Sequence, residues 1–358
     1  MLYNFIFPYF NFISGINLLR YITFRTMCAL LTSLIISFLL YPAFIKRFKL
    51  SQPIRSDGPA SHIVQKQGTP TMGGAIIIAS TIISSILWGN IANAYLILLI
   101  LLTFFYCLLG FYDDILKVKF KNSKGIKGKK KFFLQVVIAI LFSYAVELLR
   151  APEIAGHLTF PFFKNFALNS SVFLIIFTTF VIVGSSNAVN LTDGLDGLAT
   201  FPAMLVAFCL GIISYIVGHF IFANYLQITY IATAGELSIF CGALIGACLG
   251  FLWYNAPPAM IFMGDTGSLA IGGALGGISV IIKHEFVLAI AGGLFVFEAL
   301  SVMMQVAYFR CTGRRIFLMA PIHHHFEKKG WTESTVVIRF WIISFVFMLI
   351  GLATLKIR

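Results

Sequence analysis

Long apolar runs recur along the whole chain, and they restrict the fold more than any other feature of the sequence. Most runs are about 18–24 residues long, the length that crosses the roughly 30 Å hydrocarbon layer of a bilayer as an α-helix. A membrane β-barrel would instead show short segments of alternating polarity. Only 11% of the 358 residues are charged and the mean hydropathy is +0.94, so a soluble globule would lack polar surface. The sequence therefore predicts an all-α polytopic membrane protein.

The runs define ten predicted transmembrane helices in one integral-membrane domain, residues 1–358. Residues 1–22, rich in Phe and Tyr, are predicted to lie at the membrane interface before the first span. The predicted spans are residues 24–45, 73–90, 94–112, 132–149, 170–188, 197–217, 234–253, 259–282, 286–308 and 336–356. Odd-numbered loops between these spans share one face of the membrane.

Basic residues concentrate in three odd-numbered loops, residues 46–72, 113–131 and 309–335. Together these loops account for the whole formal net charge of +13. The positive-inside rule places them in the cytoplasm, and ten spans then put both termini outside. Arg20 and Arg25, near the start of the first span, argue mildly against this orientation.

The chain's six aspartates all fall in or beside odd-numbered loops, on the face that is otherwise basic. They are Asp57, Asp113, Asp114, Asp193, Asp196 and Asp265. The even-numbered loops contain glutamates only. Carboxylates that are distant in sequence but gather on one face are typical of an active site, so we expect one at the cytoplasmic face.

The motif "GFYDDILK" (110–117) ends the third predicted span with two adjacent carboxylates, Asp113 and Asp114. Neighbouring carboxylates repel one another unless a cation lies between them, which favours a divalent metal or a basic pocket. The alternative is a solvated helix end that faces the lysines after it. Those eight lysines, at positions 117, 119, 121, 124, 127, 129, 130 and 131, are interpreted mainly as a membrane-surface feature.

Two further motifs join aspartates to glycines at the start of apolar runs. In "NAVNLTDGLDGLA" (187–199), Asp193 and Asp196 could be helix caps, but four polar side chains beside two glycines favour a loop close to a ligand. In "FMGDTGSLAIGGALGG" (262–277), Asp265 is a second candidate ligand group or an N-cap. The glycines at 272, 273, 276 and 277 predict close helix packing.

The segment "APIHHHFEKKG" (320–330) places three histidines beside basic residues. Successive helical side chains diverge by about 100°, so the three cannot share one metal. Phosphate binding fits the imidazoles and their basic neighbours, and attraction to anionic lipid is the alternative. Glu298 and Gln305 lie on one face of the ninth span, in a functional or a structural role. "KQGTPTMGG" (66–74) is a weaker candidate for holding a diphosphate.

These motifs, with "PIHHHFEKKGW", occur in one order, and along nearly its whole length the chain resembles the phospho-N-acetylmuramoyl-pentapeptide transferases. These belong to the polyprenyl-phosphate N-acetylhexosamine-1-phosphate transferase superfamily. The resemblance implies a ten-span homodimer in the bacterial inner membrane, with periplasmic termini and a cytoplasmic active site. It also implies a reaction in which UDP-MurNAc-pentapeptide and undecaprenyl phosphate give lipid I and UMP with Mg²⁺. Membrane lipid is a further expected partner and nucleic acid is not.

The resemblance also assigns roles to residues. The expected catalytic residues are Asp113, Asp114, Asp193, Asp265 and His324, and the expected metal ligands are Asp265 and Asp193. The expected substrate-binding residues are Lys66, Thr71, Asn187, Asn190, Gly194, Leu195, Asp196, Asn255, Phe262, Gln305, His323 and His325. Among these, the Gly194–Asp196 turn would contact the nucleoside and Phe262 would stack on uracil.

The expected chemistry is phosphoryl transfer, which depends mainly on positioning and charge neutralisation. Direct attack by the lipid phosphate, assisted by Asp113 or Asp114, is favoured, and an aspartyl-phosphosugar intermediate is the rival mechanism. A GlcNAc-1-phosphate transferase is the alternative within the superfamily. A transporter is the alternative of another class, but its acids would lie near the bilayer midplane rather than at the ends of spans.

Overall fold

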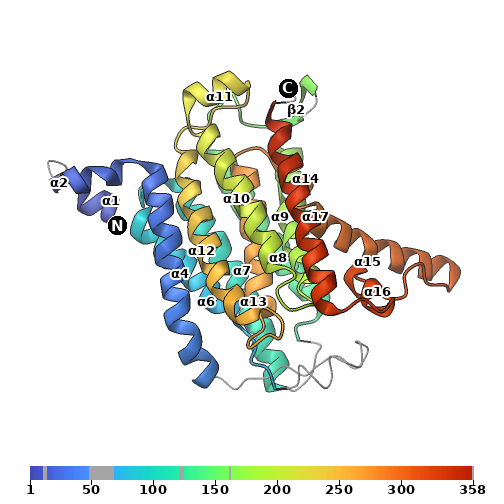
Figure 1. The fold of residues 1–358 in the computed structure, drawn as a ribbon. Helices are drawn as coiled ribbons and strands as arrows, with labels where there is room; N and C mark the ends of the chain where they lie inside the picture. The colour runs from blue at the N-terminus through green and yellow to red at the C-terminus, as the bar shows by residue number, and fades with distance from the viewer. Residues whose placement is uncertain (11–13, 48–67, 121–124, 161–162, 357–358) are drawn as a thin grey trace.

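The computed structural model describes residues 1–358 except 11–13, 48–67, 121–124, 161–162 and 357–358. Its long helices run side by side in one bundle, except α15, which projects away from it (Figure 1). They are α4 (Ile22–Arg47), α6 (Gly74–Trp88), α7 (Ala94–Lys119), α8 (Gly128–Leu149), α9 (Ser171–Thr192), α10 (Thr200–Val217), α12 (Leu237–Asn255), α13 (Gly264–Ile281), α15 (Gly293–Thr312) and α17 (Glu333–Ala353).

Short elements connect the long helices. They are the helices α1 (Leu2–Phe5), α2 (Phe7–Phe10), α3 (Ser14–Asn17), α11 (Phe220–Leu226), α14 (Glu285–Ala291) and α16 (Ile322–Lys328), with the 3₁₀ turns η1 (Leu18–Arg20), η2 (Ala234–Glu236) and η3 (Thr354–Lys356). An antiparallel hairpin of β1 (His157–Phe160) and β2 (Phe163–Asn169), which the sequence did not lead us to expect, follows α8.

Eight helices are long and apolar enough to cross a membrane, which confirms the all-α polytopic fold for the described residues. The spans predicted at 73–90 and 259–282 correspond to α6 and α13, which are not among those eight helices. The count of ten and the orientation of the termini stay predictions. In Figure 1, α4 begins and α17 ends toward the same end of the bundle.

Helix α13 lies at the centre of the bundle, between α7 and α9. A Cβ added to Gly272 would come within 2.6 Å of the α9 backbone, and one added to Gly276 would lie 2.9 Å from Ile182. On the other side, a Cβ on Gly273 would lie 3.0 Å from Tyr106 of α7. The glycines therefore allow the close packing that the sequence predicts, and this packing fixes the start of α13 against the end of α7.

Arg25, which argued mildly against the predicted orientation, is buried in α4 and paired with Glu236. Two guanidinium nitrogens donate to the two carboxylate oxygens at 2.8 and 2.6 Å. A neutralised, buried arginine says little about which face of the membrane it belongs to, because the positive-inside rule concerns loop charges.

Helix boundaries differ from the predicted spans where polar residues occur. α7 continues to Lys119, beyond the predicted end at 112, so both aspartates of "GFYDDILK" are helical. α9 continues to Thr192. The predicted span 286–308 is broken at Gly292 into α14 and α15, and α15 projects away from the bundle with α16 beside it (Figure 1).

Candidate active site

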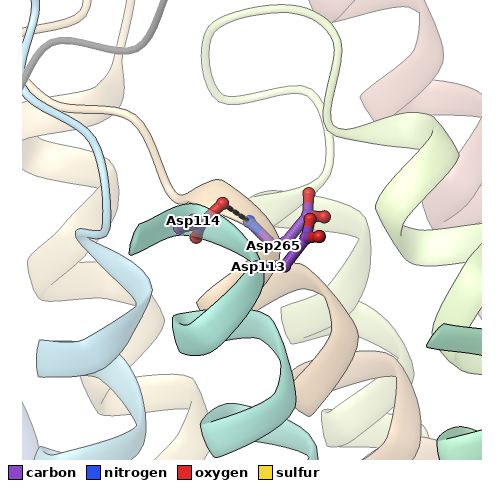
Figure 2. A group of neighbouring side chains, drawn as sticks. All are labelled: Asp113, Asp114 and Asp265. Carbon is purple, nitrogen blue, oxygen red and sulfur yellow. Dashed lines mark hydrogen bonds between the residues drawn. The ribbon is translucent and has the colours of Figure 1, made fainter. Parts of the chain in front are cut away.

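Three carboxylates meet at one end of the bundle: Asp113 and Asp114 from the last turns of α7, and Asp265 from the first turn of α13 (Figure 2). Each offers an oxygen within 4.8 Å of the other two. We call these three residues the acidic centre. Asp113 and Asp114 are 2% and 0% exposed, so the interpretation of "DD" as a solvated helix end is wrong.

Two lysines neutralise the acidic centre. Lys117, one turn after the aspartate pair, places Nζ 2.8 Å from Asp113 Oδ2, 2.8 Å from Asp265 Oδ2 and 3.5 Å from Asp114 Oδ1. Lys131 of α8 contacts Asp265 Oδ2 and lies 3.4 Å from Asp113 Oδ2. The membrane-surface interpretation of the lysine run is wrong for these two. For the exposed members Lys119, Lys127, Lys129 and Lys130 it stays a prediction, and residues 121–124 are outside the described structure.

Asp114 caps the helix that carries Asp265. Its Oδ2 accepts hydrogen bonds from Thr266 N at 2.9 Å and Thr266 Oγ1 at 2.7 Å, and its Oδ1 accepts from Asp265 N at 3.2 Å. A carboxylate bound to the first N–H groups of a helix is also favoured by the helix dipole. The interpretation of Asp265 as an N-cap is wrong: the N-cap position is Met263, and the Asp265 carboxylate contacts the lysines.

The end of α9 supplies one amide, that of Asn190, to the same centre. Asn190 Nδ2 donates to Asp265 Oδ1 at 2.9 Å and to Ser268 Oγ at 2.8 Å. One turn earlier, Asn187 Nδ2 donates to Gln135 Oε1 of α8 at 2.9 Å. Both oxygens of Asp265 are therefore held by residues from other helices, since its Oδ2 faces the two lysines.

The 193–198 turn connects α9 to α10, and residues from other segments of the chain form hydrogen bonds with it. Gly197 N donates to Asn255 Oδ1 at 2.9 Å, and Gly197 O accepts from Trp341 Nε1 at 3.2 Å. Asp196 Oδ2 accepts from Ala259 N at 3.0 Å. The interpretation of Asp193 or Asp196 as a cap of α10 is wrong, because the N-cap position is Ala199 and no side chain caps it.

Asn255 connects this turn to the loop that carries Phe262. Its Nδ2 donates to Ile261 O at 2.8 Å while its Oδ1 accepts from Gly197. Phe262 N donates to Pro70 O at 2.8 Å, and Phe262 O accepts from Gly73 N at 2.9 Å. Asn255 is buried, so its amide positions both segments, and direct contact with a substrate stays a prediction.

His323 of α16 is fully buried between Glu298 and the 193–198 turn. Its Nδ1 lies 3.1 Å from Glu298 Oε2, and both side chains are 0% exposed. A Cβ added to Gly194 would overlap His323 Nε2. The glycine is therefore required by contact with the histidine, and His323 supports the turn from inside the protein.

The other two histidines have different surroundings. His324 Nδ1 lies 2.6 Å from Glu327 Oε2 within α16. His325 Nδ1 accepts from Leu318 N at 3.1 Å, which requires that this nitrogen carry no proton. Burial and the positive charge of Lys329 lower the pKa of His325, and both favour the same neutral ring.

Three predicted residues remain: Thr71, Gln305 and Lys66. Thr71 is buried, and its Oγ1 has no hydrogen-bond partner among the described residues. Gln305 Oε1 accepts from Ile316 N and Phe317 N at 3.1 and 3.0 Å, so it fixes the loop after α15. Lys66 lies outside the described residues.

Carboxylate oxygens are the ligands that Mg²⁺ prefers, and it usually takes one or two of them together with substrate phosphates. The acidic centre supplies them, and Asp114 is already occupied as a cap. The donor set therefore fits a magnesium ion held chiefly by Asp265 and Asp113. Asp193 is not in the group of carboxylates close enough to share an ion, and its assignment as a ligand stays a prediction.

Comparison with known proteins identifies the family to which the chain is similar. The model of glycosyl transferase family 4 matches residues 96–283, and a phospho-N-acetylmuramoyl-pentapeptide-transferase signature matches residues 66–78. A Pelagibacter ubique (strain HTCC1062) protein named phospho-N-acetylmuramoyl-pentapeptide-transferase is 56% identical over 361 residues. A Granulibacter bethesdensis (strain ATCC BAA-1260 / CGDNIH1) protein of the same name is 52% identical over 362 residues. Both alignments cover 100% of each chain, and the acidic centre lies within the first match.

Proposed function

The chain belongs to the phospho-N-acetylmuramoyl-pentapeptide-transferase family, and on that premise we propose how its residues carry out the reaction. The enzyme transfers phospho-MurNAc-pentapeptide from UDP-MurNAc-pentapeptide to undecaprenyl phosphate, giving lipid I and UMP. This is the first membrane step of peptidoglycan synthesis. The observation that carries our assignment of roles is the meeting of three carboxylates, two lysines and Asn190 at one end of the helix bundle.

The proposed step is direct attack by the lipid phosphate. One of its oxygens forms a bond to the phosphorus that carries the sugar, the bond from that phosphorus to UMP breaks, and UMP leaves with the electron pair. Asp113 is the better candidate to orient the attacking phosphate, because Asp114 is committed to Thr266 and Asp265 as a helix cap. Asp113 Oδ1 is oriented by Ile126 N at 2.6 Å.

The two lysines balance charge during this step. The reacting groups are all anionic, so a site built from carboxylates alone would repel them. Lys117 and Lys131 bring the formal charge of the centre from −3 to −1. Asp265 and Asp113 would hold Mg²⁺, which when bound neutralises the pyrophosphate and stabilises departing UMP.

The nucleotide is proposed to bind between the 193–198 turn and Phe262. Asn255 holds these two segments at a set separation, since its side chain is bonded to both. His324 lies beside the buried His323, with ring centroids 4.2 Å apart, and is proposed to contact the substrate's phosphates. We place this end of the bundle at the cytoplasmic face of the inner membrane, and we propose a homodimer.

The first test is UMP release by the purified protein with UDP-MurNAc-pentapeptide, undecaprenyl phosphate and Mg²⁺. We expect release with this substrate, none with UDP-GlcNAc, and a loss of at least about 100-fold in Asp265→Asn. Glu153→Gln, an exposed change far from the site, is the matched control. UMP release without the lipid would favour the aspartyl intermediate over direct attack, and no release with the full mixture would refute the assignment.

A further inference from the structure

Glu333 is joined to the 193–198 turn although 137 residues separate it from Asp196. It is the first residue of α17, and its Oε1 accepts a hydrogen bond from Asp196 N at 2.9 Å. The acceptor is a carboxylate, and hydrogen bonds to charged acceptors are roughly twice as strong as neutral ones. The bond fixes the peptide plane between Leu195 and Asp196, in the middle of the turn.

The position of Glu333 is itself fixed by its helix. Thr332 caps α17 because its Oγ1 accepts a hydrogen bond from Thr335 N at 3.3 Å. One turn further on, Val336 and Val337 are 0% and 1% exposed. They form a small hydrophobic cluster with Leu195 and Leu198 of the turn, which is separate from the main core. α17 therefore cannot shift without moving the turn.

The turn's other bonds show what Glu333 adds. Asn255 and Trp341 hold the peptide groups of Gly197, at the end of the turn that enters α10. Glu333 holds the peptide group before it, next to Gly194 and Leu195. Without that acceptor, the first half of the turn keeps its apolar contacts but loses the bond that sets the direction of its N–H group.

We propose that Glu333 is a positioning residue that keeps the 193–198 turn in its nucleotide-binding conformation. The proposal rests on the proposed function, in which this turn binds the uridine nucleotide. Glu333 acts through its acceptor oxygen rather than through its charge alone. Glutamine, which retains that oxygen, should therefore preserve most of the effect, and alanine should not.

The test compares Glu333→Ala and Glu333→Gln with the matched exposed control Glu153→Gln. KM for UDP-MurNAc-pentapeptide, KM for undecaprenyl phosphate and kcat are measured for each, together with UMP affinity by calorimetry. For Glu333→Ala we expect about a tenfold rise in the nucleotide KM and in the UMP dissociation constant, with kcat and the lipid KM within about twofold. Glu333→Gln should recover most of the affinity.

Two results would overturn the proposal: an unchanged nucleotide KM in Glu333→Ala, or a loss in Glu333→Gln as large as in Glu333→Ala. A fall in kcat and melting temperature with unchanged KM would assign Glu333 a purely structural role and also overturn it. Failure of the proposed function is distinguishable, because the wild-type protein would then release no UMP.

Discussion

Asp114 accepts two hydrogen bonds from Thr266, from its backbone N at 2.9 Å and from its hydroxyl at 2.7 Å. The two residues are 152 positions apart, and the bonds join the end of α7 to the beginning of α13. One aspartate of the adjacent pair thus builds the site, while the other faces the two lysines. The two adjacent aspartates therefore have different roles, one structural and one in the acidic centre, which their sequence motif does not distinguish.

The division predicts different outcomes at the two positions. Asp114→Asn should lower the melting temperature, because one amide oxygen cannot replace two carboxylate oxygens that accept from three donors. The expected cost is about 1–3 kcal/mol. Asp113→Asn should lower the rate of UMP release at least about 100-fold with a smaller change in melting temperature. Thermal unfolding in detergent and UMP release check both, and an Asp114→Asn protein as stable as the wild type would contradict the capping role.

Gly194→Ala should weaken nucleotide binding, because the added methyl group overlaps His323 Nε2. We expect at least a tenfold loss of UMP affinity, measured by calorimetry. The double variant Gly194→Ala/His323→Ala removes the overlapping ring and should recover part of that affinity. No difference between the single and double variants would show that the clash is not the cause.

Lys131→Met should lower kcat and at the same time lower the Mg²⁺ concentration needed for half-maximal activity. The ammonium group lies against Asp265 and 3.4 Å from Asp113, so its removal makes these carboxylates more attractive to a cation. Removing the ion with EDTA should abolish UMP release in both proteins. A raised Mg²⁺ requirement in Lys131→Met would argue against a shared position for lysine and ion.

Stability should fall as pH rises from about 4.5 to about 7 because of Glu285, which lies just before the predicted span 286–308. Burial raises the pKa of Glu285 to about 7, although the charges of Arg150 and Lys283 act to lower it. The folded state therefore holds a proton that the unfolded state loses above its pKa of 4.5. The resulting stabilisation is complete below pH 4.5 and is lost by about pH 7, at roughly 1.4 kcal/mol per unit of pKa.

Melting temperatures of the wild type and Glu285→Gln between pH 5 and pH 8 check this prediction. Glutamine cannot titrate, so the difference between the two proteins should grow in favour of the variant as pH rises. Parallel curves would show that Glu285 does not bind a proton in this range.

Hydropathy predicted the long helices well because long apolar runs are stable in lipid. It predicted helix ends poorly where charged side chains are neutralised inside the protein. The third span was predicted to end at 112 because two aspartates follow, yet α7 continues since Lys117 faces both. The spacing of three and four residues between these groups was visible in the sequence and could have revealed the pairing.

Other features of the site depend on contacts that no local pattern contains. The true cap of α13 is a residue from another helix, so the local motif suggested Asp265 instead. Lys131 was one lysine in a run, and only the position of α8 shows that it turns inward. The contact between His323 and Gly194 likewise joins two motifs that the sequence presents separately.

Lys117 also has a consequence for how the chain enters the bilayer during its synthesis. α7 is made about 150 residues before Asp265 and its surroundings exist. A charge at the centre of a membrane helix costs about 2.5–3.5 kcal/mol on insertion, and Asp113 and Asp114 lie nearer the end of α7. Because Lys117 belongs to the same helix as Asp113 and Asp114, the nascent segment carries its own counter-charge into the membrane. Lys117, which partly neutralises the acidic centre in the folded protein, thus also neutralises part of the charge of Asp113 and Asp114 before the rest of the site is translated.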